Sequence, residues 1–350
     1  MKLSFRWYGE KDDISLNEIK QIPGVEGIVT AIYDVEVGSP WPLGKIKRLK
    51  GMIEKHDLEL TAIESVPVHE DIKIGRETRD EYIENFKTTI KNLGKAGINV
   101  VTYNFMPVFD WTRSDLSYEL PDGSKALIYE EEKVKKMDPL QGDLDLPGWD
   151  ASYDDQELKS LLEEYQKVSE EDLWNNLRYF LKEIIKTAEE AEVRMAIHPD
   201  DPPWSIFGLP RIIKNKESLQ KLVDIVDSPY NGMAICSGSL GADPDNNLPD
   251  IIREFGNKNR IHFAHLRNIE YTGKKSFKEK AHPSSHGSLD MVEILKAYYE
   301  TGFEGPLRPD HGRMIWGETG KPGYGLYDRA LGAAYINGIW ETLNKTFNRN

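Results

Sequence analysis

Four side chains of metal-binding type stand at or near the ends of four successive apolar segments: His198, Cys236, His265 and Asp310. Imidazole, thiolate and carboxylate groups are common ligands of divalent metals in proteins. Because a thiolate is a soft ligand, the set disfavours Mg²⁺ and Ca²⁺ and suits Mn²⁺, Fe²⁺, Co²⁺, Ni²⁺ or Zn²⁺. If the four segments end at one place, the sequence predicts a metal site that acts as a Lewis acid on an oxygen-rich substrate.

Each of these residues also has an ordinary structural explanation. A single histidine at a strand end is most often a hydrogen-bonded core residue, and a single cysteine is usually a small buried hydrophobe. Asp310 could cap the turn that follows it. The metal site is favoured because four consecutive segments each supply one ligand. His262 lies further from the end of its segment, and we interpret it as structural.

Further polar residues surround the four candidates. Asp200 and Asp201 follow the first histidine, and Arg267 and Asn268 follow the second. A guanidinium group can bind a carboxylate with two parallel hydrogen bonds. The sequence therefore predicts that Arg267 binds the carboxylate of an acidic substrate, with Asn268 beside it.

The segment RPDHGR adds Arg308, His311 and Arg313 close to the last candidate ligand. Arg313 is a second candidate for binding a substrate carboxylate. Soon afterwards the residues Pro-Gly-Tyr-Gly form a tight loop, which we expect to expose Tyr324. A histidine and a tyrosine near a metal are suited to moving protons to and from a substrate.

The candidates can meet only if the segments that carry them are neighbouring strands. Eight short apolar segments recur along the chain, at residues 2–8, 27–33, 60–66, 99–105, 193–199, 232–236, 261–267 and 305–310. Their near-continuous hydrophobicity is typical of parallel strands that are covered on both faces. Helical patterns lie between them. Examples are the apolar positions Ile83, Phe86, Ile90 and Leu93, the capping box of Ser169 and Asp172, and the helix predicted after Gly287.

Eight alternations of strand and helix predict an α/β protein, a single (β/α)₈ barrel domain over residues 1–350. Active sites of such barrels lie at the carboxyl ends of the strands, which is where the candidate ligands stand. A doubly wound open sheet is the alternative. No G-x-G-x-x-G motif follows the first strand, which weakens a dinucleotide-binding version of that fold.

One long segment interrupts this alternation, at residues 107–168 after the fourth strand. It carries 16 acidic and seven basic side chains, together with aromatic residues such as Trp111. A solvated surface excursion is the simple interpretation. The other interpretation is a lid or an oligomer contact, because long insertions after barrel strands lie on the open face where substrates bind. In that case Trp111 could cover the substrate.

The composition of the 350 residues excludes several classes of protein. A net charge of −14 without a long run of Lys or Arg argues against nucleic acid and anionic membranes as partners. No apolar run approaches the roughly 20 residues of a membrane span. A single cysteine cannot form an internal disulfide, and the first residues lack the apolar core of a signal peptide. We therefore expect a cytoplasmic protein.

Four segments resemble mannonate dehydratases, a family of metal-dependent barrels related in fold to xylose isomerase: MAIHPDDPP, ICSGSLG, HFAHLRN and RPDHGR. The N-terminal FRWYG and the segment VTYNFMPVFDWTR are also similar, so the resemblance covers nearly the whole chain. It implies conversion of D-mannonate to 2-keto-3-deoxy-D-gluconate and water, in hexuronate and glucuronate catabolism, with Mn²⁺ as the usual metal. The four candidate ligands match the family's metal ligands, and His311 and Tyr324 match its acid–base positions. We also expect a homo-oligomer, a dimer or larger.

Three other functions are weighed against this one from the sequence. An aldose–ketose isomerase could use the same kind of barrel, but its two metals are typically bridged by carboxylates, whereas this chain offers Cys236. A barrel phosphodiesterase or endonuclease conflicts with the acidic balance. A non-catalytic protein that binds sugar acids is the third alternative, and in it His311 and Tyr324 would be dispensable.

Overall fold

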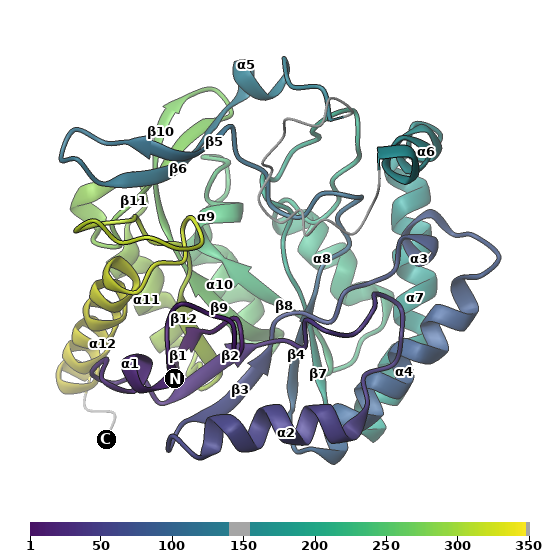
Figure 1. The fold of residues 1–350 in the computed structure, drawn as a ribbon, viewed down its shortest axis with the longest axis horizontal. Coiled ribbons are helices and arrows are strands. Elements are labelled where there is room, and N and C mark those ends of the chain that lie inside the picture. The colour runs from purple at the N-terminus through teal and green to yellow at the C-terminus, as the bar shows by residue number, and fades with distance from the viewer. Residues whose placement is uncertain (140–154, 348–350) are drawn as a thin grey trace.

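The computed structural model describes residues 1–139 and 155–347 (Figure 1). Its centre is a closed barrel of parallel strands in the order β1-β12-β9-β8-β7-β4-β3-β2. These strands are β1 (Lys2–Arg6), β2 (Gly27–Thr30), β3 (Glu59–Ile63), β4 (Val100–Tyr103), β7 (Arg194–Ile197), β8 (Asn231–Cys236), β9 (Ile261–Leu266) and β12 (Pro306–Pro309). Each of them overlaps one of the eight apolar segments, so the predicted (β/α)₈ barrel is confirmed.

Helices surround the barrel, with α2, α4 and α7 on one side of Figure 1 and α11 and α12 on the other. The helices are α1 (Leu16–Lys20), α2 (Leu43–Glu54), α3 (Glu70–Ile74), α4 (Arg79–Lys95), α5 (Glu131–Val134), α6 (Asp155–Tyr165), α7 (Glu170–Glu190), α8 (Lys216–Ile225), α9 (Ser237–Leu240), α10 (Leu248–Asn257), α11 (Met291–Glu300) and α12 (Tyr327–Phe347). Within the described residues, none of them is both long and apolar enough to cross a membrane.

The inside of the barrel is built in layers, because successive side chains of a strand point to opposite faces. One layer is a small apolar cluster of Val29, Ala62, Val100, Ala196, Ala234 and Phe263. Two residues further along four of these strands stand the polar residues Glu64, His198, Cys236 and His265. The two-residue period of the strands therefore directs these four side chains into the barrel mouth.

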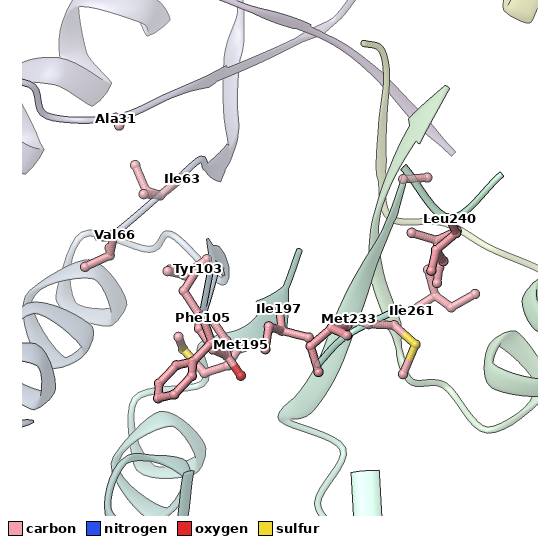
Figure 2. Packing of buried hydrophobic residues seen from close by; sticks show 14 of the residues in the cluster. Ala31, Ile63, Val66, Tyr103, Phe105, Met195, Ile197, Met233, Leu240 and Ile261 are labelled. Carbon is pink, nitrogen blue, oxygen red and sulfur yellow. The ribbon is translucent and has the colours of Figure 1, made fainter. Parts of the chain in front are cut away.

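The alternate positions of the same strands face the helices. Met195, Ile197 and Met233 belong to the large apolar core, and Figure 2 shows them beside Tyr103 and Phe105. All five are buried. This packing between strands and helices fixes the strands, and through them the polar layer at the barrel mouth.

The helices predicted from the sequence are confirmed. The four apolar positions of α4 are buried, and Phe86 of this helix packs edge to face against Phe180 of α7 at 5.1 Å between ring centroids. The capping box at the start of α7 is present: Asp172 N–H donates to Ser169 Oγ at 3.1 Å, and Ser169 N–H donates to Asp172 Oδ2 at 2.9 Å. The helix predicted after Gly287 is α11.

A second sheet, which the sequence did not predict, lies above the barrel in Figure 1. Its order is β10-β11-β6-β5, with β5 (Asp115–Glu119), β6 (Lys125–Glu130), β10 (Asn268–Gly273) and β11 (Ser276–Lys280). The strands β5 and β6 come from the 107–168 segment, whereas β10 and β11 form a hairpin after β9. The first part of the acidic segment is therefore a paired sheet rather than a plain surface loop. Residues 140–154 lie outside the described residues.

The cap of α7 gives a stability prediction. Replacing Ser169→Ala removes the acceptor for a backbone N–H, so we expect the free energy of unfolding to fall by about 1 kcal/mol. The measurement is urea denaturation of the metal-free protein. Ser169→Thr is the matched control, because threonine retains a capping hydroxyl. Equal losses in the two variants would contradict the capping role.

Candidate metal and acid–base site

Three of the four predicted ligands come together at the barrel mouth. In the described part of the chain, the ligand atoms of His198, Cys236 and His265 all lie within 4.8 Å of one another. His198 Nε2 is 3.2 Å from His265 Nδ1. Neighbouring imidazole nitrogens in a tetrahedral site with bonds of about 2.0–2.1 Å are about 3.3 Å apart, so this pair is spaced as two ligands of one ion would be.

The fourth predicted ligand, Asp310, reaches this group from one side. Its Oδ2 is 3.4 Å from Cys236 Sγ, and its Oδ1 pairs with Arg308 Nη1 at 2.8 Å. Burial alone would raise the pKa of Asp310, but the charges of His311, Arg308 and Arg267 outweigh it and hold the pKa well below its usual range. Asp310 is therefore an ionised carboxylate, the form that binds a metal.

Hydrogen bonds also place His198 and Cys236 in a form that can bind a metal. The carbonyl oxygen of Pro199 lies 2.7 Å from His198 Nδ1, which assigns the ring proton to Nδ1 and leaves the Nε2 lone pair free for a metal. Around Cys236, Ser239 N–H lies at 3.4 Å from the sulfur and Arg267 Nη2 at 3.6 Å. An amide donor and a guanidinium group both stabilise a thiolate. The donor set thus fits a divalent transition metal.

A buried network of charges lies beside the ligand group. Arg267 donates to Asp201 Oδ2 at 2.6 Å and to Glu279 Oε1 at 3.1 Å, and Arg113 contacts the same two carboxylates at 2.9 and 2.7 Å. Gly238 permits this packing, because a Cβ there would lie 1.9 Å from Arg267 Nε. The guanidinium group of Arg267 thus pairs with buried carboxylates in this structure, and its binding of a substrate carboxylate stays a prediction.

Two other predicted substrate-binding residues have partners elsewhere. Arg313 forms ion pairs with Asp328 at 2.8 Å and Asp122 at 2.9 Å. Asn268 is buried, and its side-chain amide bonds to backbone groups: Nδ2 donates to Pro283 O, and Oδ1 accepts from Ile269 N–H. Both residues therefore hold loops together in this structure, and substrate binding by either of them stays a prediction.

The two predicted acid–base residues are in direct contact. His311 Nε2 lies 2.9 Å from the hydroxyl oxygen of Tyr324, and His311 Nδ1 lies 2.9 Å from Glu279 Oε1. Arg267 Nη1, which can only donate, also lies 2.9 Å from Nδ1. In the tautomer in which Nδ1 donates to Glu279, Nε2 can accept from the Tyr324 hydroxyl. Tyr324 is buried rather than exposed, because Tyr8 packs against its ring and its hydroxyl turns inward to the histidine. Burial also raises its pKa above the ordinary value.

The predicted cover of the substrate, Trp111, lies next to this pair. Its ring centroid is 4.7 Å from that of His311 and 6.3 Å from that of Tyr324. Trp111 is half-buried, so one part of the indole remains exposed to solvent. Covering the substrate stays a prediction for this residue. His262, which we interpreted as structural, is buried and its Nδ1 lies 3.0 Å from Met195 O.

Sequence reasoning missed four residues of the site, of which Arg113 is described above. Glu64 follows β3 and contacts His265 and Arg308, Glu279 lies in β11 against His311, and Arg6 ends β1 beside Glu64. Glu64 and Arg6 could have been found, because they stand at strand ends like the ligands. Glu279 gave no such signal, since its strand is short and rich in charged residues.

The comparison with known proteins identifies the family. All 350 residues match one family, described as D-mannonate dehydratase (UxuA). The chain belongs to this family. Mannonate dehydratase 2 of Halalkalibacterium halodurans is 61% identical, over 98% of this chain and 100% of that one. Mannonate dehydratase of Streptococcus uberis is 58% identical, over 99% of both chains.

Solved structures agree with this assignment. The crystal structure of mannonate dehydratase from Streptococcus suis serotype 2 is 52% identical, covers 99% of this chain and 95% of its own, and has a TM-score of 0.93. A D-psicose 3-epimerase from Clostridium cellulolyticum has a TM-score of 0.56 at 12% identity, which shows the shared barrel fold alone. Membership of the D-mannonate dehydratase family makes the chain a metal-dependent hydro-lyase, and the isomerase and non-catalytic alternatives are not favoured.

The ligand group gives a prediction on metal content. Cys236→Ser replaces a thiolate by a hydroxyl that is a poor ligand at neutral pH, so we expect loss of bound metal from a chain that stays folded. Elemental analysis of the purified variant measures the metal, and circular dichroism measures the fold.

His262→Asn is the matched control. This histidine lies on the same strand as His265 but faces away from the ligand group, so its replacement should lower stability and leave the metal content unchanged. Full metal content in Cys236→Ser would contradict the assignment of Cys236 as a ligand.

Proposed function

We propose that the chain dehydrates D-mannonate to 2-keto-3-deoxy-D-gluconate and water, with Mn²⁺ bound by His198, Cys236, His265 and Asp310. The observation that carries this proposal is the chain of contacts from Glu279 through His311 to Tyr324 immediately beside the ligand group. His311 Nε2 is 3.9 Å from Asp310 Oδ1, so proton-transfer groups and metal ligands share one site. A bound Mn²⁺ would supply Lewis-acid polarisation of the substrate carboxylate and C2 oxygen.

The reaction requires four proton movements. A base removes the proton from C2, and an acid protonates the C3 hydroxyl so that it leaves as water. The resulting enol then takes up a proton at C3 and releases the proton of its C2 hydroxyl, which gives the ketone. We assign the first step to His311 and the second to Tyr324. The hydrogen-bond roles support this assignment, because the Tyr324 hydroxyl donates its proton and His311 Nε2 accepts one.

Glu279 prepares His311 for this role. Both of its carboxylate oxygens lie near His311 Nδ1, at 2.9 and 3.0 Å, and they favour the tautomer with the proton on that nitrogen, in which Nε2 is the accepting atom. Burial alone would raise the pKa of Glu279, but the charges of His311, Arg267 and Arg113 together lower it. The ionised carboxylate also stabilises the imidazolium that forms once His311 has taken a proton.

The charges of the site suit an anionic substrate. Four guanidinium groups face four carboxylates among its described residues: Arg6, Arg113, Arg267 and Arg308 against Glu64, Asp201, Glu279 and Asp310. A divalent cation and one thiolate would add a net single positive charge, which one substrate carboxylate balances. Arg6 is our candidate among these cations for contacting the substrate, because its Nε has no hydrogen-bond partner among the described residues and its Nη1 has only the ion pair with Glu64 at 3.2 Å.

Three further expectations remain part of the proposal. The segment 107–168 closes the site as a lid or joins two subunits, the chain forms a homo-oligomer, and it works in the cytoplasm in hexuronate catabolism. The contact of Trp111 with the acid–base pair supports a position of this segment over the substrate.

The function is tested by product formation. The protein is loaded with Mn²⁺, incubated with D-mannonate and assayed for a 2-keto-3-deoxy acid, with D-gluconate, its C2 epimer, as the comparison substrate. We expect the keto acid from D-mannonate. Absence of the keto acid in a metal-replete, folded protein would contradict the proposal, and formation of a ketose from an aldose would indicate the isomerase alternative.

The acid–base pair gives a kinetic prediction. His311→Asn and Tyr324→Phe should keep the metal and bind substrate, but each should lower kcat by at least ~100-fold, the usual contribution of general acid–base catalysis. Tyr327→Phe and His286→Asn, at exposed positions, are the matched controls.

Exchange of the C2 hydrogen with solvent deuterium then separates the two roles. Tyr324→Phe should still exchange this hydrogen, because the base remains, whereas His311→Asn should not. Near-normal turnover in either variant would remove that residue from the proton path, and the opposite exchange pattern would reverse the assignment.

A further inference from the structure

The carboxylate of Glu64 lies across the barrel from the proposed ligands. Glu64 follows β3, and His265 lies in β9, four strands away around a barrel of eight. Its side chain is 15% exposed, so the carboxylate lies in the barrel mouth with little access to water. A buried carboxylate at this place needs partners, and those partners connect it to the ligand group.

The first partner is the imidazole of His265. Glu64 Oε2 is 3.5 Å from His265 Nε2, and this nitrogen has no hydrogen-bond partner among the described residues. The other ring nitrogen, Nδ1, faces His198 Nε2 at 3.2 Å. One edge of the ring thus faces the second histidine ligand and the opposite edge faces a carboxylate. Histidines that bind metals commonly have this arrangement, in which the carboxylate fixes the tautomer and orientation of the ring.

The second partner leads to the fourth ligand. Arg308 donates to Glu64 through Nε at 2.9 Å and through Nη2 at 2.6 Å, which makes a bidentate ion pair. The third nitrogen of the same guanidinium group, Nη1, lies 2.8 Å from Asp310 Oδ1. Because the guanidinium group is planar and rigid, holding one edge of it against Glu64 also fixes the edge that meets Asp310.

We propose that Glu64 is a positioning residue for the metal site, which orients His265 directly and Asp310 through Arg308. This inference rests on the proposed metal site. Glu64 sets the ring of His265 so that Nδ1 is the ligand atom and Nε2 carries the proton. It also holds Arg308 so that one oxygen of Asp310 is occupied and the other is presented to the metal beside Cys236.

A purely structural role makes a different prediction. In that case Glu64 would only neutralise Arg6 and Arg308, and its loss would lower stability without changing metal affinity. The double variant Glu64→Gln with Arg6→Gln separates the two roles. It removes one negative and one positive charge together, leaves Arg308 paired with Asp310, and still lacks the carboxylate that faces His265.

The experiment compares metal affinity in the wild-type chain, Glu64→Gln, the double variant and Glu59→Gln, by titration of the metal-free proteins with Mn²⁺. Glu59 is the matched control, because it begins β3, the strand that Glu64 follows, but is exposed and pairs with Lys2. We expect Glu64→Gln and the double variant each to bind Mn²⁺ at least ~10-fold more weakly, the usual effect of removing such a partner. Glu59→Gln should bind as the wild type does.

A second measurement follows the ring itself. Spectra of ¹⁵N-labelled histidines in the Zn²⁺-loaded chain should show His265 with its proton on Nε2, and this signature should be lost in Glu64→Gln. His265→Asn assigns the signal.

The outcomes are distinguishable. If Cys236→Ser and the wild-type chain bind Mn²⁺ equally, the proposed metal site is wrong and this inference falls with it. If Cys236→Ser loses the metal while the double variant binds Mn²⁺ as the wild type does, the metal site stands and the role of Glu64 is wrong. If Glu64→Gln alone fails to fold, the double variant decides.

Discussion

The guanidinium group of Arg267 is the interaction on which the rest of the site depends. It lies within 2.6 Å of Asp201, 3.1 Å of Glu279 and 3.5 Å of Asp310, and it also contacts His311 and the sulfur of Cys236. Carboxylates that are buried to this extent keep their charge only beside a fixed cation. Without Arg267, the carboxylates of Glu279 and Asp310 would both lose a counter-charge. A single cation thus joins the proposed metal ligands to the proposed acid–base pair.

The barrel can hold such a polar layer because an apolar layer of mostly small side chains lies beneath it. Most of the apolar layer consists of small side chains such as Ala62, Ala196 and Ala234, and each is followed two residues later by a polar group of the site. The larger residues of the same strands face the helices, where close packing fixes the backbone. The charged groups are therefore attached to the most rigid part of the molecule. A site that relies on hydrogen bonds near 3 Å requires this rigidity, because small displacements would break several contacts at once.

Sequence reasoning predicted the barrel and three ligands that converge, because both follow from local pattern. Apolar segments mark the strands, and the period of two fixes which side chain faces the barrel mouth. Sequence reasoning failed for residues whose burial or pairing depends on contacts between distant segments of the chain. The burial of Tyr324 depends on packing against Tyr8, more than 300 residues earlier in the chain, and the pairing of Arg267 depends on Glu279 in a hairpin without an apolar run. Glu64 also stands at a strand end, but it follows β3 and lies outside the four successive segments that carry the predicted ligands.

The second sheet gives the acidic segment 107–168 a structural role beside the site, which is separate from its proposed roles as a lid or a subunit contact. Glu279 lies in β11, and β11 pairs with β6 of that segment, where Phe277 is opposite Tyr129 and their rings stack at 5.7 Å. Arg113, at the start of the same segment, donates to Glu279 Oε1 at 2.7 and 2.9 Å. The segment therefore supports the carboxylate that orients His311 from two directions, through backbone pairing and through a buried charge. Two insertions that are distant in sequence fold into one sheet, and that sheet supplies Glu279 beside His311, whereas His311 and the proposed metal ligands stand at the ends of barrel strands.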